Sequence, residues 1–151
     1  MVSARSDVRT LLKREESYAV HSLLYLHDHP GAPTARMARD LQMPAAFTAK
    51  VVQRLVAEGL VESRQGRSGG LSLRVSLQQL SLLDVIEAIS GRVMMDTCET
   101  KLACPTQQRT GRCRLNGVWV ALTLQLREAF AAVSLADLTE SPAAAARRVT
   151  H

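Results

Sequence analysis

The stretch PAAFTAKVVQRLVAEGLVESRQGRSGGLSLRV, residues 44–75, decides the fold of this chain. Its first part, 44–58, carries apolar residues at helical spacing and stops at a glycine, so it predicts a helix. Its second part predicts a β-hairpin, because a strand-like run at 60–64 and an alternating run at 71–75 flank a glycine-rich turn. The stretch therefore predicts a helix followed directly by a basic hairpin.

Two further helices are expected upstream of this stretch. Residues 8–29 hold apolar side chains at helical spacing, contain no internal glycine or proline, and are followed by a Pro-Gly pair. Residues 34–41 predict a short helix, and residues 42–43 leave only a tight connection to the helix at 44–58. This order of elements, followed by a hairpin, is typical of a winged helix-turn-helix. The expected fold class is therefore mainly α: a winged helix-turn-helix DNA-binding domain with a β-hairpin wing.

The helix at 44–58 has two faces of different chemistry. Its outer face is small and polar at its start and basic further on, which suits a helix tip that enters a DNA major groove. Arginines on the hairpin can reach a minor groove or phosphates. The inner, apolar face consists of Phe47, Val51, Val52, Leu55 and Val56. The residues expected to contact DNA are Ala45, Ala46, Thr48, Lys50, Arg54, Arg64, Arg67 and Ser68.

The charge of the chain agrees with a polyanionic partner. The net charge is +5 and the pI is about 9.6. Residues 1–75 hold 11 Lys and Arg against 7 Asp and Glu, whereas residues 76–151 hold 8 against 7. The basic excess therefore lies in the half that carries the expected DNA-reading helix, which favours double-stranded operator DNA as the partner.

Other classes of protein fit the sequence less well. The N-terminus is charged and lacks the apolar centre of a signal peptide, and no apolar run approaches the roughly 20 residues of a membrane span. We therefore expect a cytoplasmic protein without a membrane partner. The sequence shows no nucleophile–base–acid set, and QGRSGG lacks the lysine of a phosphate-binding loop, so an enzyme is not expected.

Downstream of the hairpin the pattern changes from helix to loop and back to helix. Residues 81–90 predict a helix whose first turn carries an S-x-x-D capping box. Residues 92–113 lack helical periodicity and predict a long, functional loop. Residues 115–133 carry an apolar stripe that a small winged domain cannot cover, so we expect this helix to pair with its twin in a homodimer. The expected division is a winged domain at 1–91, a cysteine loop at 92–114, a dimerisation helix at 115–138 and a flexible tail at 139–151.

All three cysteines, Cys98, Cys104 and Cys113, lie in the predicted loop with the spacing C-x5-C-x8-C. Thiolates are soft ligands that suit iron–sulfur clusters, zinc and copper(I), and both gaps are wider than those of structural zinc knuckles. The residues favour a cluster but leave open another metal, a thiol–disulfide switch, or cysteines without chemistry. They also leave open a redox protein whose basic domain is incidental.

Several stretches together resemble the IscR/NsrR-type family of bacterial regulators over roughly residues 10–138. They are YAVHSLLYL, FTAKVVQRLVAEGLVES, QGRSGGLSL, LLDVIEAISG and the cysteine loop followed by CRLNGVW. The resemblance implies a winged-helix homodimer whose DNA binding is controlled by a 2Fe-2S or 4Fe-4S cluster that senses redox stress, nitric oxide, iron or cluster supply. It implies that Cys98, Cys104 and Cys113 are cluster ligands. A metal-free or thiol–disulfide regulator of the same fold is the alternative.

The chain departs from the family pattern at two places in this loop. The second gap between cysteines is longer than in most members, and Asn116 stands where IscR-like members carry a histidine ligand. Other members take a fourth ligand from the first helix of the partner subunit. By that resemblance His21 is the candidate for the fourth ligand, with Glu16 as the second choice, while the matching Ser17 is a poor iron ligand.

Overall fold

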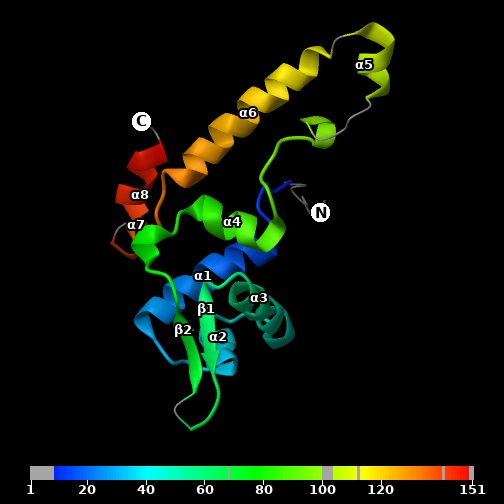
Figure 1. Cartoon of the computed structure of the whole chain (residues 1–151). Coiled ribbons are helices and arrows are strands. Elements are labelled where there is room, and N and C mark those ends of the chain that lie inside the picture. Colours follow the sequence, from blue (N-terminus) through cyan, green and yellow to red (C-terminus); the bar gives the residue numbers. More distant parts are fainter. Residues whose placement is uncertain (1–8, 68, 100–103, 112, 141, 150–151) are drawn as a thin grey trace, which may run out of the picture.

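The computed structural model describes residues 9–67, 69–99, 104–111, 113–140 and 142–149. It is mainly helical, with one two-stranded antiparallel sheet, as the sequence predicts (Figure 1). A cluster of short helices and the hairpin forms one end of the molecule. The long helix α6 (Arg114–Ala131) extends away from it toward α5 (Pro105–Thr110) at the other end. No helix within these ranges is long and apolar enough to cross a membrane.

The winged domain is built around α1, which packs against α3, α4 and β2. Its core contains aliphatic side chains from every element, as expected for a chain with few aromatic residues. The elements of this domain are α1 (Arg14–Asp28), α2 (Thr34–Asp40), α3 (Ala45–Ala57), β1 (Val61–Arg64), β2 (Gly70–Leu73), the 3-10 turn η1 (Leu77–Gln79) and α4 (Leu82–Ser90). The fully buried core side chains include Leu23, Leu26, Met37, Leu55, Val61, Leu77 and Val85.

The first helix begins later than predicted. It starts at Arg14 instead of residue 8, because the Glu16 carboxylate accepts a hydrogen bond from the backbone N–H of Lys13 at 2.7 Å and caps the helix there. Leu11 and Leu12, which the pattern assigned to the apolar face, are exposed outside the helix. The prediction was wrong at this end because helical spacing alone does not reveal the cap.

A tyrosine–aspartate hydrogen bond joins α1 to α2. The hydroxyl of Tyr25 donates to Oδ2 of Asp40 at 2.6 Å, and Arg36 and Arg39 lie 3.5 Å from the same carboxylate. The hydrogen bond to Asp40 raises the pKa of Tyr25, and the same bond lowers the pKa of Asp40. These contacts hold the first two helices of the helix-turn-helix together.

Replacing Tyr25 with phenylalanine should therefore lower the unfolding temperature at neutral pH. Because the folded-state pKa of Asp40 is depressed, its contribution is present above the ordinary value of 3.8 and is lost as the pH falls through the lower folded value. The wild-type advantage should shrink in acid in thermal melts followed by circular dichroism. Tyr18→Phe is the control, since Tyr18 packs its ring edge-on against Phe47. An advantage of the same size at neutral pH and in strong acid would contradict this account.

The wing forms as predicted. Val61 pairs with Leu73 and Arg64 with Gly70 in an antiparallel register. The hairpin is pinned to the loop after α1, because Gly31 N–H donates to the Leu71 carbonyl oxygen at 2.8 Å. A Cβ at Gly70 would lie 1.9 Å from the Gly31 carbonyl oxygen, so only glycine fits this close approach.

Residues after α4 differ in part from the predicted loop. The S-x-x-D capping box is confirmed, since the Ser81 hydroxyl accepts from Asp84 N–H at 3.1 Å and the carboxylate of Asp84 accepts from Ser81 N–H at 2.8 Å. The segment predicted as a loop contains the 3-10 turn η2 (Thr97–Glu99) and the helix α5 (Pro105–Thr110). Proline is tolerated at a first helical position, so its presence did not exclude a helix here.

The long helix and the tail complete the chain. The helix α6 (Arg114–Ala131) matches its prediction, and Leu135 beyond it is fully buried in the core of the winged domain. The predicted flexible tail instead contains α7 (Asp137–Glu140) and α8 (Pro142–Val149). The prediction overlooked that Pro142 and a run of alanines form a good helix start. Arg148 also lies 3.2 Å from the Asp137 carboxylate.

Candidate functional site

The outer face of α3 begins with small, exposed side chains. Ala45, Ala46 and Lys50 are exposed, as the prediction for a DNA-reading helix requires. The placement of Thr48 on this face was wrong: it is fully buried, and its hydroxyl donates to the Pro44 carbonyl oxygen at 3.0 Å. A buried side chain cannot contact a DNA groove, so Thr48 leaves the set of candidate DNA contacts.

The position of Thr48 was available from the sequence. It lies three and four residues before the buried Val51 and Val52, which places it on the same face of the helix. The prediction placed it on the polar face because threonine carries a hydroxyl. That hydroxyl bonds the carbonyl four residues earlier and is satisfied within the helix, so the side chain can be buried. Val56, assigned to the apolar face, is instead exposed.

Arg54 points toward α4 and not only outward. Its Nε donates to the Ala88 carbonyl oxygen at 2.9 Å, and its Nη2 lies 3.3 Å from the Glu58 carboxylate. Half of its side chain remains exposed. The structure therefore gives Arg54 a contact within the protein that the sequence did not predict.

The wing presents exposed arginines. Arg64 is exposed beside Glu62, with 2.8 Å between Nη2 of Arg64 and Oε1 of Glu62, and Arg67 is exposed at the hairpin turn. Ser68, the last predicted DNA contact, lies outside the described residues. The outer face of α3 and the wing belong to the same compact domain, far from α5 in Figure 1.

The three cysteines lie in the segment that joins α4 to α6, residues 91–113, which is called the cysteine segment below. Cys98 lies within η2, Cys104 directly precedes α5, and Cys113 directly precedes α6. All three thiols are half-buried. The backbone N–H of Cys98 donates to Oδ1 of Asp96 at 2.8 Å. Arg109 and Arg114 are exposed nearby in the sequence, whereas Lys101 and Arg112 lie outside the described residues.

The chain does not gather these thiols into a metal site by itself. Among the side chains that the structure describes, no three of His, Cys, Asp or Glu lie close enough to hold a metal ion. His21 is exposed on α1 beside a shallow surface pocket that Asp40 and Met43 also line. Glu16 is 5% exposed and caps α1, so its carboxylate already has a structural role.

The helix α6 presents apolar side chains to solvent on two rows. Leu115, Val118 and Leu122 form one row, and Val120 and Leu124 form the other; Leu115 is 56% and Leu124 55% exposed. Between the rows the helix faces its own chain with Thr123, which is buried, and with half-buried neighbours such as Trp119. The sequence predicted one continuous stripe, whereas the winged domain covers only a part of it.

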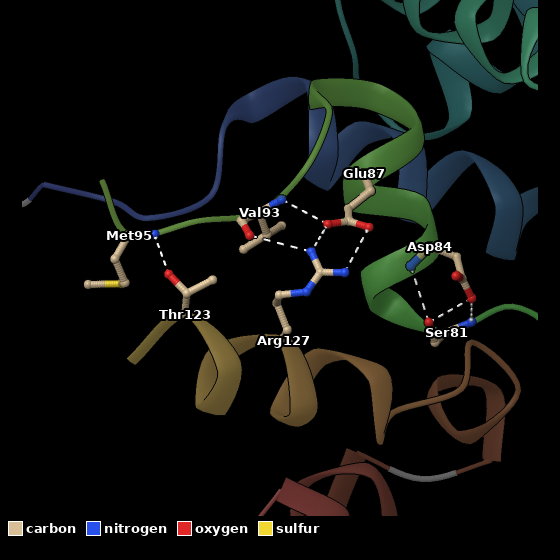
Figure 2. Close-up of polar contacts among 7 residues, drawn as sticks. All are labelled: Ser81, Asp84, Glu87, Val93, Met95, Thr123 and Arg127. Atoms are coloured by element: carbon tan, nitrogen blue, oxygen red, sulfur yellow. Dashed lines mark hydrogen bonds and ion pairs between the residues drawn. The ribbon is translucent and has the colours of Figure 1, made fainter. Parts of the chain in front are cut away.

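Sequence reasoning missed the polar contacts that join α4, α6 and the segment between them. Glu87 and Arg127 form an ion pair, and the Thr123 hydroxyl accepts a hydrogen bond from Met95 N–H at 2.8 Å (Figure 2). A cavity of about 500 Å³ lies beside them, lined by residues 9–13, by 90–96 and by apolar side chains of α6. Nothing in local periodicity signals a contact between positions 40 residues apart.

Comparison with known sequences supports a regulator. Residues 12–141 match the Rrf2 family, described as iron-dependent transcriptional regulators. The chain is 34% identical over 88 residues to the repressor NsrR of Streptomyces coelicolor, and 27% identical over 127 residues to IscR of Xenorhabdus nematophila. The NsrR match covers 58% of this chain and 57% of NsrR, and the IscR match covers 82% of this chain and 76% of IscR. A match to a regulator of Lactococcus lactis covers 48% of that protein. The chain therefore spans about half the length of this regulator and of NsrR.

Solved structures show the same fold. IscR of T. potens superposes with a TM-score of 0.67 at 19% identity and covers 87% of each chain. CymR, described as the global cysteine regulator of B. subtilis, superposes with a TM-score of 0.64 at 18% identity, and the match covers 86% of this chain and 96% of CymR. The predicted winged-helix fold is thereby confirmed. The family match and the relatives are transcriptional regulators and not enzymes, as the sequence predicts. Because the family match covers most of the chain, this protein belongs to the Rrf2 family of DNA-binding transcriptional regulators.

Proposed function

We propose that this protein is a homodimeric repressor whose binding to operator DNA is controlled by an iron–sulfur cluster on Cys98, Cys104 and Cys113. The observation that carries this proposal is the position of three half-buried thiols in the one segment that joins the DNA-reading domain to α6. A change in that segment can act on both the DNA-reading domain and α6. A signal that controls DNA binding has to reach the DNA-reading domain in this way.

The reading of DNA is assigned to α3 and the wing. The exposed tip of α3, with Ala45 and Ala46, admits the backbone of the helix close to base edges, and Lys50 follows one turn later. Arg64 and Arg67 carry exposed guanidinium groups on the hairpin, which suits phosphate or minor-groove contacts. Ser68, outside the described residues, remains in the proposed set because the sequence predicts a glycine-rich turn around it.

The homodimer is assigned to α6. This helix turns its polar pair, Thr123 and Arg127, toward its own domain and leaves Leu115, Val118 and Leu122 exposed. Covering one such leucine contributes roughly 1.5–3 kcal/mol. A second copy offers the same row, and a symmetric dimer presents two α3 helices to two half-sites of an operator.

The chemistry of the thiols fits an iron–sulfur group. Three soft donors lie within a segment of 16 residues, and the exposed guanidinium groups of Arg109 and Arg114 can offset negative charge there. A bound cluster would supply a centre that changes oxidation state or breaks down under redox stress, nitric oxide or iron shortage. Because the thiols are not gathered in the described residues, holding the group requires the cysteine segment to rearrange.

The fourth ligand is assigned to His21 of the partner subunit. His21 is exposed on α1 and has no neighbouring pair of ligands in its own chain within the described residues. Glu16, the second choice from the sequence, is not proposed, because its carboxylate caps α1 and is buried. Asn116 offers only an amide at the start of α6.

A regulator without metal is the second candidate. It is favoured by one observation: the described side chains show no ready-made site for a metal ion, while three thiols are present. In that case oxidation of two thiols to a disulfide would carry the signal.

Purification without oxygen distinguishes the two candidates. We expect visible absorbance typical of a cluster, and a native mass spectrum of a dimer that carries one iron–sulfur group for each chain. An operator duplex selected from a random-sequence pool should bind with steep salt dependence, and its affinity should change when the group is removed. A colourless, iron-free dimer whose DNA affinity responds only to thiol oxidation would favour the metal-free candidate.

A further inference from the structure

Two neighbouring residues of α4 bond to opposite parts of the molecule. The Glu87 carboxylate bonds to the cysteine segment and to α6. The backbone carbonyl of Ala88 accepts a hydrogen bond from the recognition helix α3. A short rigid helix with such neighbours is placed to transmit a displacement from one side to the other.

On the first side, the segment that leads to Cys98 is held by a polar clamp. Oε1 of Glu87 accepts from Val93 N–H at 2.8 Å and also pairs with Nη1 of Arg127 (Figure 2). The same Nη1 lies 3.4 Å from the Val93 carbonyl oxygen, and Nη2 lies 3.4 Å from Oε2 of Glu87.

A second bond lies two residues closer to the cysteine. Met95 N–H donates to the hydroxyl of the buried Thr123, one helical turn before Arg127 on α6. The backbone at positions 93 and 95, five and three residues before Cys98, is therefore tied to α4 and α6. These bonds hold the backbone that leads to Cys98 against both helices.

The clamp is specific because its charges are partly withdrawn from water. Arg127 is 26% and Glu87 27% exposed, and each also bonds to the backbone of Val93. Charge-assisted bonds of this kind have a defined geometry, and removing one partner leaves the other charge poorly solvated.

On the second side, Arg54 connects α4 to the last turns of α3. Its Nε donates to the Ala88 carbonyl oxygen, and its Nη2 pairs with Glu58 just after α3 ends. This guanidinium bonds to α4 while half of the side chain remains exposed, whereas Lys50 lies on the outer face.

We infer that Glu87, Arg127 and Arg54 are positioning residues that couple the state of the cysteine segment to the orientation of α3 on the operator. The signal that enters the segment rests on the proposed function, whereas the coupling itself rests only on the described contacts. Arg54 thus affects DNA affinity through α4 and not by contact with a base.

Three variants test the inference: Arg127→Met, which keeps the apolar stem; Glu87→Gln, which keeps an acceptor for Val93 N–H; and Arg54→Met. The control is Glu128→Gln, an exposed neighbour on α6. Unfolding temperature and dimer mass are checked for each variant. Two measurements follow: the ratio of operator affinities with and without the cluster, and amide hydrogen exchange of residues 52–58 in cluster-free protein.

We expect Arg127→Met to reduce the wild-type affinity ratio by about fivefold or more and to speed exchange at residues 52–58. Glu87→Gln should act in the same direction with a smaller change, and Glu128→Gln should match the wild type. The double variant Arg127→Met with Arg54→Met should be no worse than either single variant, because both interrupt the same connection. If the two substitutions acted only by destabilising the whole protein, their effects would instead add.

The outcomes separate the inference from the proposed function. If the wild type binds the operator with equal affinity with and without the cluster, cluster control is refuted. The hydrogen-exchange data alone then test the coupling. Unchanged exchange at residues 52–58 in Arg127→Met and Glu87→Gln would overturn the coupling, whatever the cluster does. Additive effects of Arg127→Met and Arg54→Met would overturn it as well.

Discussion

Replacing Cys104 with alanine should remove the visible absorbance of the anaerobically purified protein and its bound iron. Cys104 lies between the other two cysteines and directly before α5, so its loss takes the middle donor from the segment. Two thiols cannot replace a set of three, and the described side chains hold no ready group of three His, Cys, Asp or Glu that could take over the role. Operator affinity should then become insensitive to iron removal, oxidants and nitric oxide.

The matched control for this variant is Gln107→Ala. Gln107 is exposed on α5, three residues after Cys104, and alanine preserves the helix. This control should keep both the absorbance and the response of DNA binding. Unchanged absorbance in Cys104→Ala would show that Cys104 is not a ligand, while lost absorbance with a retained response would separate the cluster from the control of DNA binding.

Placing a carboxylate in the exposed row of α6, as in Leu122→Glu, should convert the dimer into a monomer. Leu122 lies one turn after Val118, and both are exposed in the single chain. In a symmetric dimer one substitution introduces two buried charges, each unpaired, at a cost of several kcal/mol. Since a monomer reads one half-site, operator affinity should fall by about 100-fold or more.

Ala121→Glu is the control for the dimer experiment. It adds the same charge to an exposed position of α6 that belongs to neither apolar row. It should remain a dimer in light scattering coupled to size exclusion, with wild-type operator affinity. A dimeric Leu122→Glu protein would rule out the proposed interface, and a monomer that binds the operator as tightly as the wild type would rule out two-site reading.

Much of the fold was predictable because its signals are local. The capping box at Ser81 involves residues three apart, and the hairpin follows from glycines at 66, 69 and 70 between alternating strands. The errors had separate causes. At Thr48 the polar side chain outweighed its helical spacing, and in the tail the alanine run was overlooked.

The candidate site was only partly predictable. The exposed Ala45, Ala46 and Lys50 on α3 were predicted, because helical spacing assigns faces directly. The second role of Arg54 was not, because its acceptor is a backbone carbonyl 34 residues away and any residue type carries one. The cysteines were evident as a set, but spacing along the chain does not say whether thiols converge in space.

The sequence by itself therefore determined the winged helix-turn-helix, the exposed face of α3 that is proposed to read DNA, and the segment in which the thiols lie. These depend on periodicity, capping and glycine conformation, which act over a few residues. Only the tertiary structure decided that Glu87 and Arg127 clamp the backbone before Cys98, and that Leu135 returns to the core of the winged domain. Such contacts depend on how the helices pack, and packing is set by the whole core rather than by any single stretch.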